Sequence, residues 1–145
     1  MFVTIVMTLG LVVVSVIVHY EILRATSNSM PGMIVLPRYR LLVVIAAAFV
    51  AHIIEICLFA LAYAAMQFWW GLGGIVGPLE GNWVDFFYFS AASYTTLGMG
   101  ELLPTGEMRL VAAVESLAGL VLIGWSASFT YLSMVKFWDL HETRK

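Results

Sequence analysis

The chain has 145 residues and a formal net charge of -2; 62% of its residues are hydrophobic and only 11% are charged. Because a soluble domain is roughly 45–50% apolar and about a quarter charged, this composition excludes an ordinary water-soluble protein and indicates an integral membrane protein. The weak negative charge also argues against nucleic acid as a partner.

The first predicted element is a transmembrane helix over residues 1–20. A helix needs about 20 mostly apolar residues to cross the hydrocarbon core, and this segment supplies them. It has neither a basic start nor a clear small-residue cleavage site, so it is not predicted to be a signal peptide. It also carries no ladder of arginines, which argues against a voltage sensor of that kind.

Residues 21–40 are more polar and are predicted to form a cytoplasmic or interfacial loop, because two prolines interrupt them. Residues 41–70 form a second apolar run, which predicts an outer transmembrane helix. Its last residues, Trp69 and Trp70, suit the membrane interface, where amphipathic rings lie at headgroup depth.

Two further helices are predicted in the second half of the chain. Residues 83–94 are apolar and aromatic, but about 12 residues are too few to cross the membrane, so we expect a re-entrant helix. An irregular segment follows at residues 95–100, and residues 107–135 form a third span. A polar tail, residues 136–145, follows that span.

The basic residues predict the orientation of these spans. Residues 71–82 contain no lysine or arginine, whereas residues 21–40 and 136–145 contain three each. Cytoplasmic loops carry the excess of such residues, so the 21–40 loop and the tail are predicted to be cytoplasmic. The N-terminus and the re-entrant helix then lie outside, and we expect a multi-pass protein of the cell membrane.

The segment TTLGMG at residues 95–100 is unusual for membrane depth. Gly98 and Gly100 stand two apart, which disfavours a helix, and glycine enters the left-handed region without a Cβ clash. A backbone that alternates in the sign of φ can point successive carbonyls to one side. Moving a bare ion into a low-dielectric medium costs on the order of tens of kcal/mol. No single loop has enough oxygens to replace the water shell, so several copies around an axis are implied.

The stretch FYFSAASYTTLGMGELLPTGEMR, residues 87–109, resembles the pore region of the tetrameric potassium-channel family. The filter of that family commonly reads TTVGYGD, followed shortly by proline. Leu97 stands in for valine, Glu101 for aspartate and Met99 for tyrosine. The resemblance extends over residues 41–135 and implies an all-α homotetrameric channel built from an outer helix, a pore helix, a filter and an inner helix. The positions that match the pattern are Thr95, Thr96, Gly98, Gly100 and Pro104.

The resemblance also implies roles for the filter residues. The carbonyls of Thr96, Leu97, Gly98 and Met99, with the Thr96 hydroxyl, would coordinate dehydrated K⁺. The Gly100 carbonyl would meet ions at the outer mouth. Glu101, repeated in each subunit, would form an acidic ring that concentrates cations there, and the C-terminal end of the pore helix would favour cations in the central cavity.

Met99 cannot donate the hydrogen bond that the tyrosine of the family makes. We expect it to pack against the aromatic residues Phe87, Tyr88 and Phe89, in contacts worth about 0.3–1.5 kcal/mol each. The filter is therefore expected to be held by packing more than by hydrogen bonds. Three functions stay open: a potassium-selective channel, a weakly selective monovalent cation channel, and a non-conducting membrane subunit that modulates another channel. No nucleophile–base pair points to an enzyme.

The inner helix contains several candidate gating residues. Gly119 is either a gating hinge or a site of close helix packing by small residues. Ile123, Ala127 and Tyr131 either line the cavity and the cytoplasmic constriction, which an apolar ring could close by dewetting, or face lipid and other helices. Glu115 is either a structural hydrogen-bonding group, bonded to Ser90 or Ser93, or part of the ion pathway.

The remaining titratable residues are few. His52 and Glu55 are three apart and share one helix face; they form either a proton sensor or a hydrogen-bonded link to Ser15 or Thr8 of the first span. The chain has three histidines, well separated in the sequence, and one cysteine, Cys57. This spacing predicts no metal site of the familiar kind, so we expect no cofactor apart from permeant K⁺.

Overall fold

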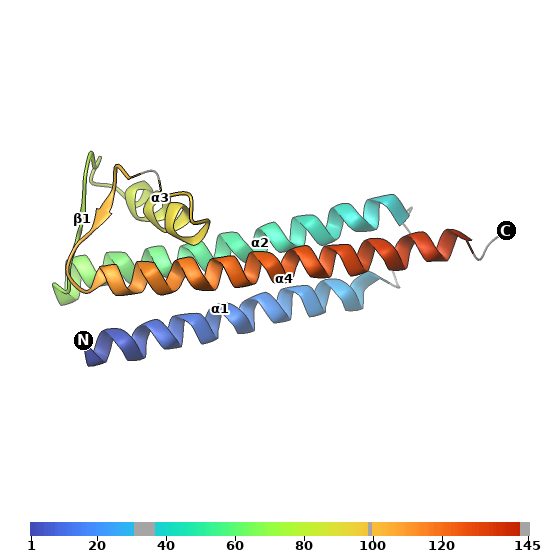
Figure 1. The fold of residues 1–145 in the computed structure, drawn as a ribbon, viewed down its shortest axis with the longest axis horizontal. Coiled ribbons are helices and arrows are strands. Elements are labelled where there is room, and N and C mark those ends of the chain that lie inside the picture. Colours follow the sequence, from blue (N-terminus) through green and yellow to red (C-terminus); the bar gives the residue numbers. More distant parts are fainter. Residues whose placement is uncertain (31–36, 99, 143–145) are drawn as a thin grey trace.

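The computed structural model describes residues 1–30, 37–98 and 100–142 of the chain. Within these ranges, three helices are long and apolar enough to cross a membrane: Phe2–Ser29, Tyr39–Trp70 and Met108–Lys136. They run side by side along the long axis of the molecule, and a short helix packs against one end of them (Figure 1). The chain is an all-α membrane protein, as its composition predicts.

Helix α1, Phe2–Ser29, is longer than predicted, because it continues past residue 20. Residues 21–29 contain neither proline nor glycine. Glu21 and Arg24, three apart on the helix surface, form an ion pair of 3.3 Å, and this spacing supports a helix. The prediction of a loop over residues 21–40 is therefore wrong at its start.

Helix α2, Pro37–Ala65, begins before residue 41, because proline is tolerated in the first turn of a helix. The predicted loop is therefore wrong at its end as well. A short π-helical segment, η2 (Met66–Trp70), continues α2 to the predicted end of the outer helix. Helix α4, Met108–Glu142, begins one residue later than predicted and continues past residue 135, so much of the predicted tail is helical.

Helix α3, Trp83–Tyr94, occupies the range predicted for the re-entrant helix. A capping box fixes its start: Asn82 accepts a hydrogen bond from the Val84 N–H at 2.7 Å, and Asp85 accepts one from the Asn82 N–H at 3.2 Å. Two short strands, β1 (Ile75–Val76) and β2 (Leu103–Pro104), pair antiparallel. They tie the loop before α3 to the loop after the TTLGMG segment.

The hydrophobic core lies at the same end of the molecule as α3. It joins α2 and η2 to β1, α3 and α4, and it includes the edge-to-face pair of Tyr63 and Phe89, whose ring centroids lie 5.0 Å apart. This core holds α3 against the two helices that flank it. Its buried members are Phe59, Ala60, Tyr63, Met66, Ile75, Phe86, Phe89, Met108 and Val111.

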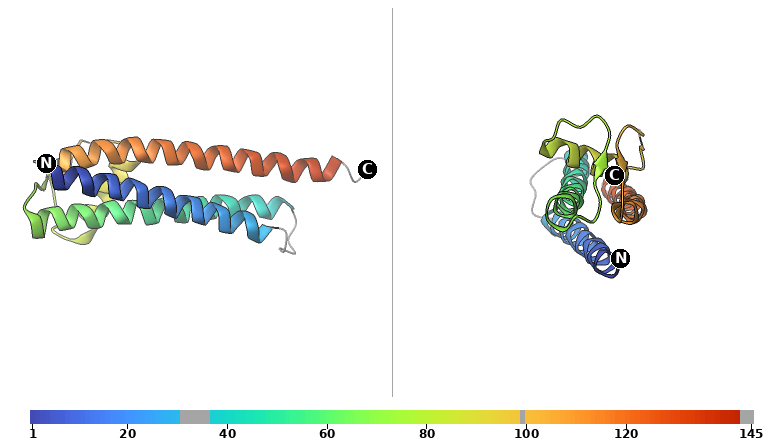
Figure 2. Two further views of the ribbon diagram at one scale, coloured as in Figure 1. Left: turned by 90° about the horizontal axis from the view of Figure 1, so that it is seen from below. Right: turned by 90° about the vertical axis from the view of Figure 1, so that its left-hand side faces the viewer.

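Helix α1 contacts both α2 and α4, and it turns polar side chains toward them. Thr4, Thr8, Ser15 and His19 are buried, whereas apolar residues such as Val13 and Ile17 are exposed. This arrangement suits lipid, which is as apolar as the exposed side chains, so that the polar groups find partners only inside the bundle. Figure 2 shows α1 alongside the other two long helices from two directions.

Candidate functional site

The candidate site begins at the C-terminal end of α3. The helix does not stop abruptly there: the Thr95 N–H donates to the Ala91 carbonyl at 3.1 Å, and the Leu97 N–H donates to the Ala92 carbonyl at 3.0 Å. The Thr95 hydroxyl also donates to the Ala91 carbonyl, at 2.7 Å. These bonds fix the direction in which the chain leaves the helix.

The glycines that follow α3 adopt the left-handed backbone that the absence of a Cβ allows. Thr96, Gly98 and Gly100 have φ values of 58°, 53° and 79°, whereas Leu97, between the first two, does not have a positive φ. For Thr96, which has a Cβ, the left-handed conformation costs roughly 1–2 kcal/mol, so surrounding contacts must hold it. Met99, and with it the predicted packing of its side chain, lies outside the described residues.

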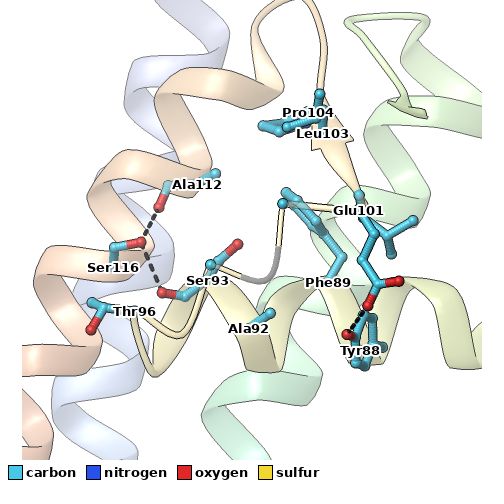
Figure 3. A pocket seen from close by; sticks show the side chains of 13 residues that line it. Tyr88, Phe89, Ala92, Ser93, Thr96, Glu101, Leu103, Pro104, Ala112 and Ser116 are labelled. Atoms are coloured by element: carbon cyan, nitrogen blue, oxygen red, sulfur yellow. Dashed lines mark hydrogen bonds between the residues drawn. The ribbon is translucent and has the colours of Figure 1, made fainter. Parts of the chain in front are cut away.

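The segment is open on one side. Thr95, Thr96, Leu97 and Gly98 are all exposed, and Leu97 is exposed by 61% despite its apolar side chain. On its other side lies a pocket of about 390 Å³ between α3, the segment and α4 (Figure 3). The described residues of this segment are therefore exposed in the single chain, and they border a pocket that α3 and α4 also line.

A hydrogen bond that the sequence did not suggest links the outer end of this segment to α3. The Tyr88 hydroxyl donates to Glu101 Oε1 at 2.7 Å (Figure 3). This bond raises the pKa of the Tyr88 phenol, because the neighbouring carboxylate stabilises the protonated form. The expectation that packing would hold the filter more than hydrogen bonds therefore needs correction at this end.

Helix α4 holds the end of α3 through small residues. The Ser116 hydroxyl donates to the Ser93 carbonyl at 2.8 Å. One turn further along α4, Gly119 is buried against the carbonyl of Tyr94, so closely that a Cβ at this position would overlap that oxygen. The close-packing interpretation of Gly119 thus has a specific contact, at the residue that immediately precedes the TTLGMG segment.

Glu115 is fully buried and joins three helices. Ser90 of α3 donates to its Oε1 at 2.5 Å, and the Tyr63 hydroxyl of α2 donates to its Oε2. The predicted bond to Ser90 is confirmed, while Ser93 bonds to α4 through its carbonyl instead. Both carboxyl oxygens are engaged within the core, which favours the structural role.

The predicted cavity-lining residues share one face of α4. Ile123, Ala127 and Tyr131 are spaced four apart, and all three are exposed in the single chain. Ile123 and Ala127 also line a pocket of about 530 Å³ between α4 and α2. The face is therefore available for a water-filled cavity or for another subunit.

His52 and Glu55 form a cluster that the sequence analysis only partly predicted. The predicted link to α1 exists, but its partner is His19: Ser15 Oγ has no hydrogen-bond partner among the described residues, and Thr8 bonds to the Thr4 carbonyl. The histidines are well separated in the sequence, but the fold brings two of them together: the ring centroids of His19 and His52 lie 5.2 Å apart. Their spacing in the sequence is therefore no guide to whether they form a site.

Comparison with known proteins identifies the family of the chain. Residues 40–135, well over half of the chain, match a family model described as "Ion channel". The match covers nearly all of α2, the loops, α3 and most of α4. Helix α1 lies outside it.

A stretch of 82 residues, 55% of the chain, is 30% identical to the inward rectifier potassium channel Kirbac3.1 of Paramagnetospirillum magnetotacticum. That stretch spans 26% of the length of this relative. No solved structure matches the chain. The family consists of channels and not of enzymes, in agreement with the sequence, and the chain belongs to the potassium-channel pore family of ion channels.

Proposed function

We propose that the protein is a homotetrameric channel that conducts K⁺ passively through residues 95–100. One observation carries the proposal: a segment with positive φ at Thr96, Gly98 and Gly100 leaves the end of α3 and is exposed in the single chain. Irregular backbone at membrane depth is tolerated only where protein or a watery cavity covers it. Four copies around an axis supply that cover.

In this assembly, rings of carbonyls from Thr96, Leu97, Gly98 and Met99 replace the water shell of K⁺. The Thr96 hydroxyl adds a ligand at the inner end, and the Gly100 carbonyl meets ions at the outer mouth. The selectivity for K⁺ follows from ligands that belong to the backbone, which the replacement of tyrosine by Met99 leaves in place. Conduction by this path needs no cofactor beyond the permeant ion.

The charges near this path support a cation pathway. Helix α3 ends at the segment, and the C-terminal end of a helix carries a partial negative charge. Glu101 is exposed at the other end of the segment, held by Tyr88. Four copies of this carboxylate form an acidic ring that raises the local cation concentration.

The inner part of the path is formed by the exposed face of α4. Ile123, Ala127 and Tyr131 line the cavity and the cytoplasmic constriction in the proposed tetramer. The N-terminus and α3 lie at one end of the bundle and the last turns of α4 at the other (Figure 1). Together with the distribution of basic residues, this supports an extracellular N-terminus and a cytoplasmic end of α4.

Flux measurements on the purified protein test the proposal. Liposomes that contain this protein alone should conduct K⁺, and the reversal potential under opposing K⁺ and Na⁺ gradients should lie near the K⁺ equilibrium potential. A reversal potential near zero would favour the weakly selective cation channel instead. Absence of flux from a correctly assembled particle would favour the modulatory subunit, and a particle without fourfold symmetry would contradict the filter assignment.

A further inference from the structure

A compact cluster of possible metal ligands lies where α1 meets the pore helices. Nδ1 of His19 is 2.9 Å from Glu55 Oε1, and Nδ1 of His52 is 3.2 Å from Glu55 Oε2. One ligand atom from each of the three side chains lies within 4.8 Å of the other two. His19 and Glu55 are fully buried, and the His52 side chain is 17% exposed. We propose that His19, His52 and Glu55 bind a divalent transition metal ion, with Zn²⁺ as the best fit.

The donor set suits zinc. Two imidazoles and one carboxylate are an established combination for Zn²⁺, and imidazole is a poor ligand for Mg²⁺ and Ca²⁺, which prefer oxygen. A tetrahedral zinc ion with ligands about 2.1 Å away places neighbouring ligand atoms roughly 3.4 Å apart. The two nitrogen–oxygen distances, 2.9 Å and 3.2 Å, are slightly shorter than this. Small side-chain rotations would therefore open the cluster enough to admit the ion.

The surrounding hydrogen bonds determine which ring nitrogens are free to bind a metal. The second ring nitrogen of His19, Nε2, lies 3.2 Å from the hydroxyl of Ser126 on α4. If Nε2 carries the proton and donates it to Ser126, then Nδ1 is left free to bind the metal. The Tyr94 hydroxyl donates to Glu55 and lies 2.8 Å from Nδ1 of His52. Because the Tyr94 proton is donated to Glu55, the donor in the contact with His52 is its Nδ1–H. Binding of a metal at this nitrogen therefore requires the ring proton to move to Nε2, and outer contacts of this kind set the tautomers of metal-binding histidines.

The negative charge of the buried Glu55 carboxylate favours the binding of a cation by the cluster. The partners of Glu55 among the described residues are two imidazoles and a phenol, none of which has a permanent positive charge. A buried carboxylate without such a partner is costly in a low-dielectric medium. A bound Zn²⁺ would supply this positive partner, and the site would then carry a net positive charge.

The ion also has a route to the cluster. His52 and Tyr94 line the pocket of about 530 Å³ between α2 and α4, and Ser126 belongs to its wall as well. The partly exposed edge of His52 faces this space, so an ion can reach the ligands without unfolding of the bundle. Once bound, the ion would tie α1, which supplies His19, to α2, which supplies the other two ligands.

The proposal is tested by titrating the purified full-length protein with Zn²⁺ after a chelator has removed bound metal. Isothermal titration calorimetry should show one Zn²⁺ per subunit, and an excess of Mg²⁺ or Ca²⁺ should not displace it. Protein that shows no saturable binding of Zn²⁺ would overturn the proposal and would identify the cluster as a purely hydrogen-bonded link between helices.

Substitutions locate the bound ion. His19→Gln and His52→Gln each remove one ligand and should weaken Zn²⁺ binding by about tenfold or more. His141→Gln is the matched control, because it removes the remaining histidine of the chain, and it should leave the affinity unchanged. Loss of binding in the control, with unchanged binding in the other two variants, would place the ion elsewhere and would contradict the proposal.

X-ray absorption at the zinc edge needs no variant, so it decides the question even if the substituted proteins fail to fold. The wild-type protein loaded with Zn²⁺ should show two imidazole nitrogens and at least one oxygen at about 2.0–2.2 Å. A sulfur ligand at about 2.3 Å, which only Cys57 or a methionine could supply, or a shell of oxygens alone would exclude the assigned ligands.

Discussion

The contact between Gly119 and Tyr94 allows the packing interpretation of this glycine to be tested quantitatively. A Cβ at position 119 would overlap the carbonyl oxygen of Tyr94, and it would also lie 2.9 Å from the carbonyl carbon. Both atoms belong to backbone, so relief requires α3 and α4 to move apart. Inserting a methyl group into such a contact costs about 1–3 kcal/mol. Gly119→Ala should therefore destabilise the protein despite the better helix propensity of alanine.

The same helix provides a matched control. Gly124 also lies in α4, but a Cβ there would meet no atom of the chain within 4 Å. Gly124→Ala gains about the same helix propensity, roughly 0.5–1 kcal/mol, without the clash. The difference between the two variants therefore isolates the clash and should be about 1–3 kcal/mol.

Thermal unfolding in detergent measures this difference. For a chain of this size, 1 kcal/mol corresponds to roughly 2–4 °C in Tm, so Gly119→Ala should melt roughly 2–12 °C below Gly124→Ala. K⁺ flux through Gly119→Ala should fall as well, because Tyr94 directly precedes the filter. Equal melting temperatures for the two variants would refute the close-packing argument and would leave the hinge interpretation of Gly119.

Three further predictions concern the filter. Thr96→Ala removes the hydroxyl proposed as the innermost ligand and should lower K⁺ conductance in bilayer recordings; unchanged conductance and selectivity would contradict that role. Met99→Tyr restores a hydrogen-bond donor worth about 0.5–1.5 kcal/mol, and it should raise K⁺ over Na⁺ selectivity by up to roughly tenfold in reversal-potential measurements. An unchanged ratio would argue against a loosely held native filter. The bond to Glu101 raises the pKa of Tyr88 above 10.0. The contribution of this bond to the stability of the folded protein is therefore complete below pH 10, and it is lost as the pH rises through the raised pKa. Thermal stability should therefore fall more steeply above pH 10 in the wild type than in Tyr88→Phe, and equal slopes would show that the bond contributes nothing.

The features that the sequence predicted well depend on local signals. The three spans follow from the length of apolar runs, which the thickness of the bilayer sets. Helix α3 has the predicted bounds because Asn82 and Asp85 form its cap and because glycines interrupt the chain soon after Tyr94. The positive φ values of Gly98 and Gly100 follow from the absence of a Cβ. Each of these features is determined by residues within a few positions of one another.

Helix ends were predicted less well, because polarity was taken as a sign of a loop. Residues 21–29 are polar but lack a helix breaker, and the last part of α4 is polar as well. A helix that has already formed continues at low cost, since each added residue gains a hydrogen bond. Helix α1 therefore continues through the polar residues 21–29, and membrane depth does not determine where it ends.

The sequence alone thus determined the class of the protein, its apolar spans and the left-handed backbone at Gly98 and Gly100, since hydrophobic length and glycine act locally. Only the tertiary structure decided the long-range partners. Tyr88 is hydrogen-bonded to Glu101, and Gly119 packs against the carbonyl of Tyr94. His19 is hydrogen-bonded to Glu55, which lies 36 positions away in the chain. No spacing rule predicts such pairs, because they depend on how separate helices pack side by side. In the low-dielectric interior of a membrane protein, a buried polar group is stabilised by whichever partner that packing brings within reach.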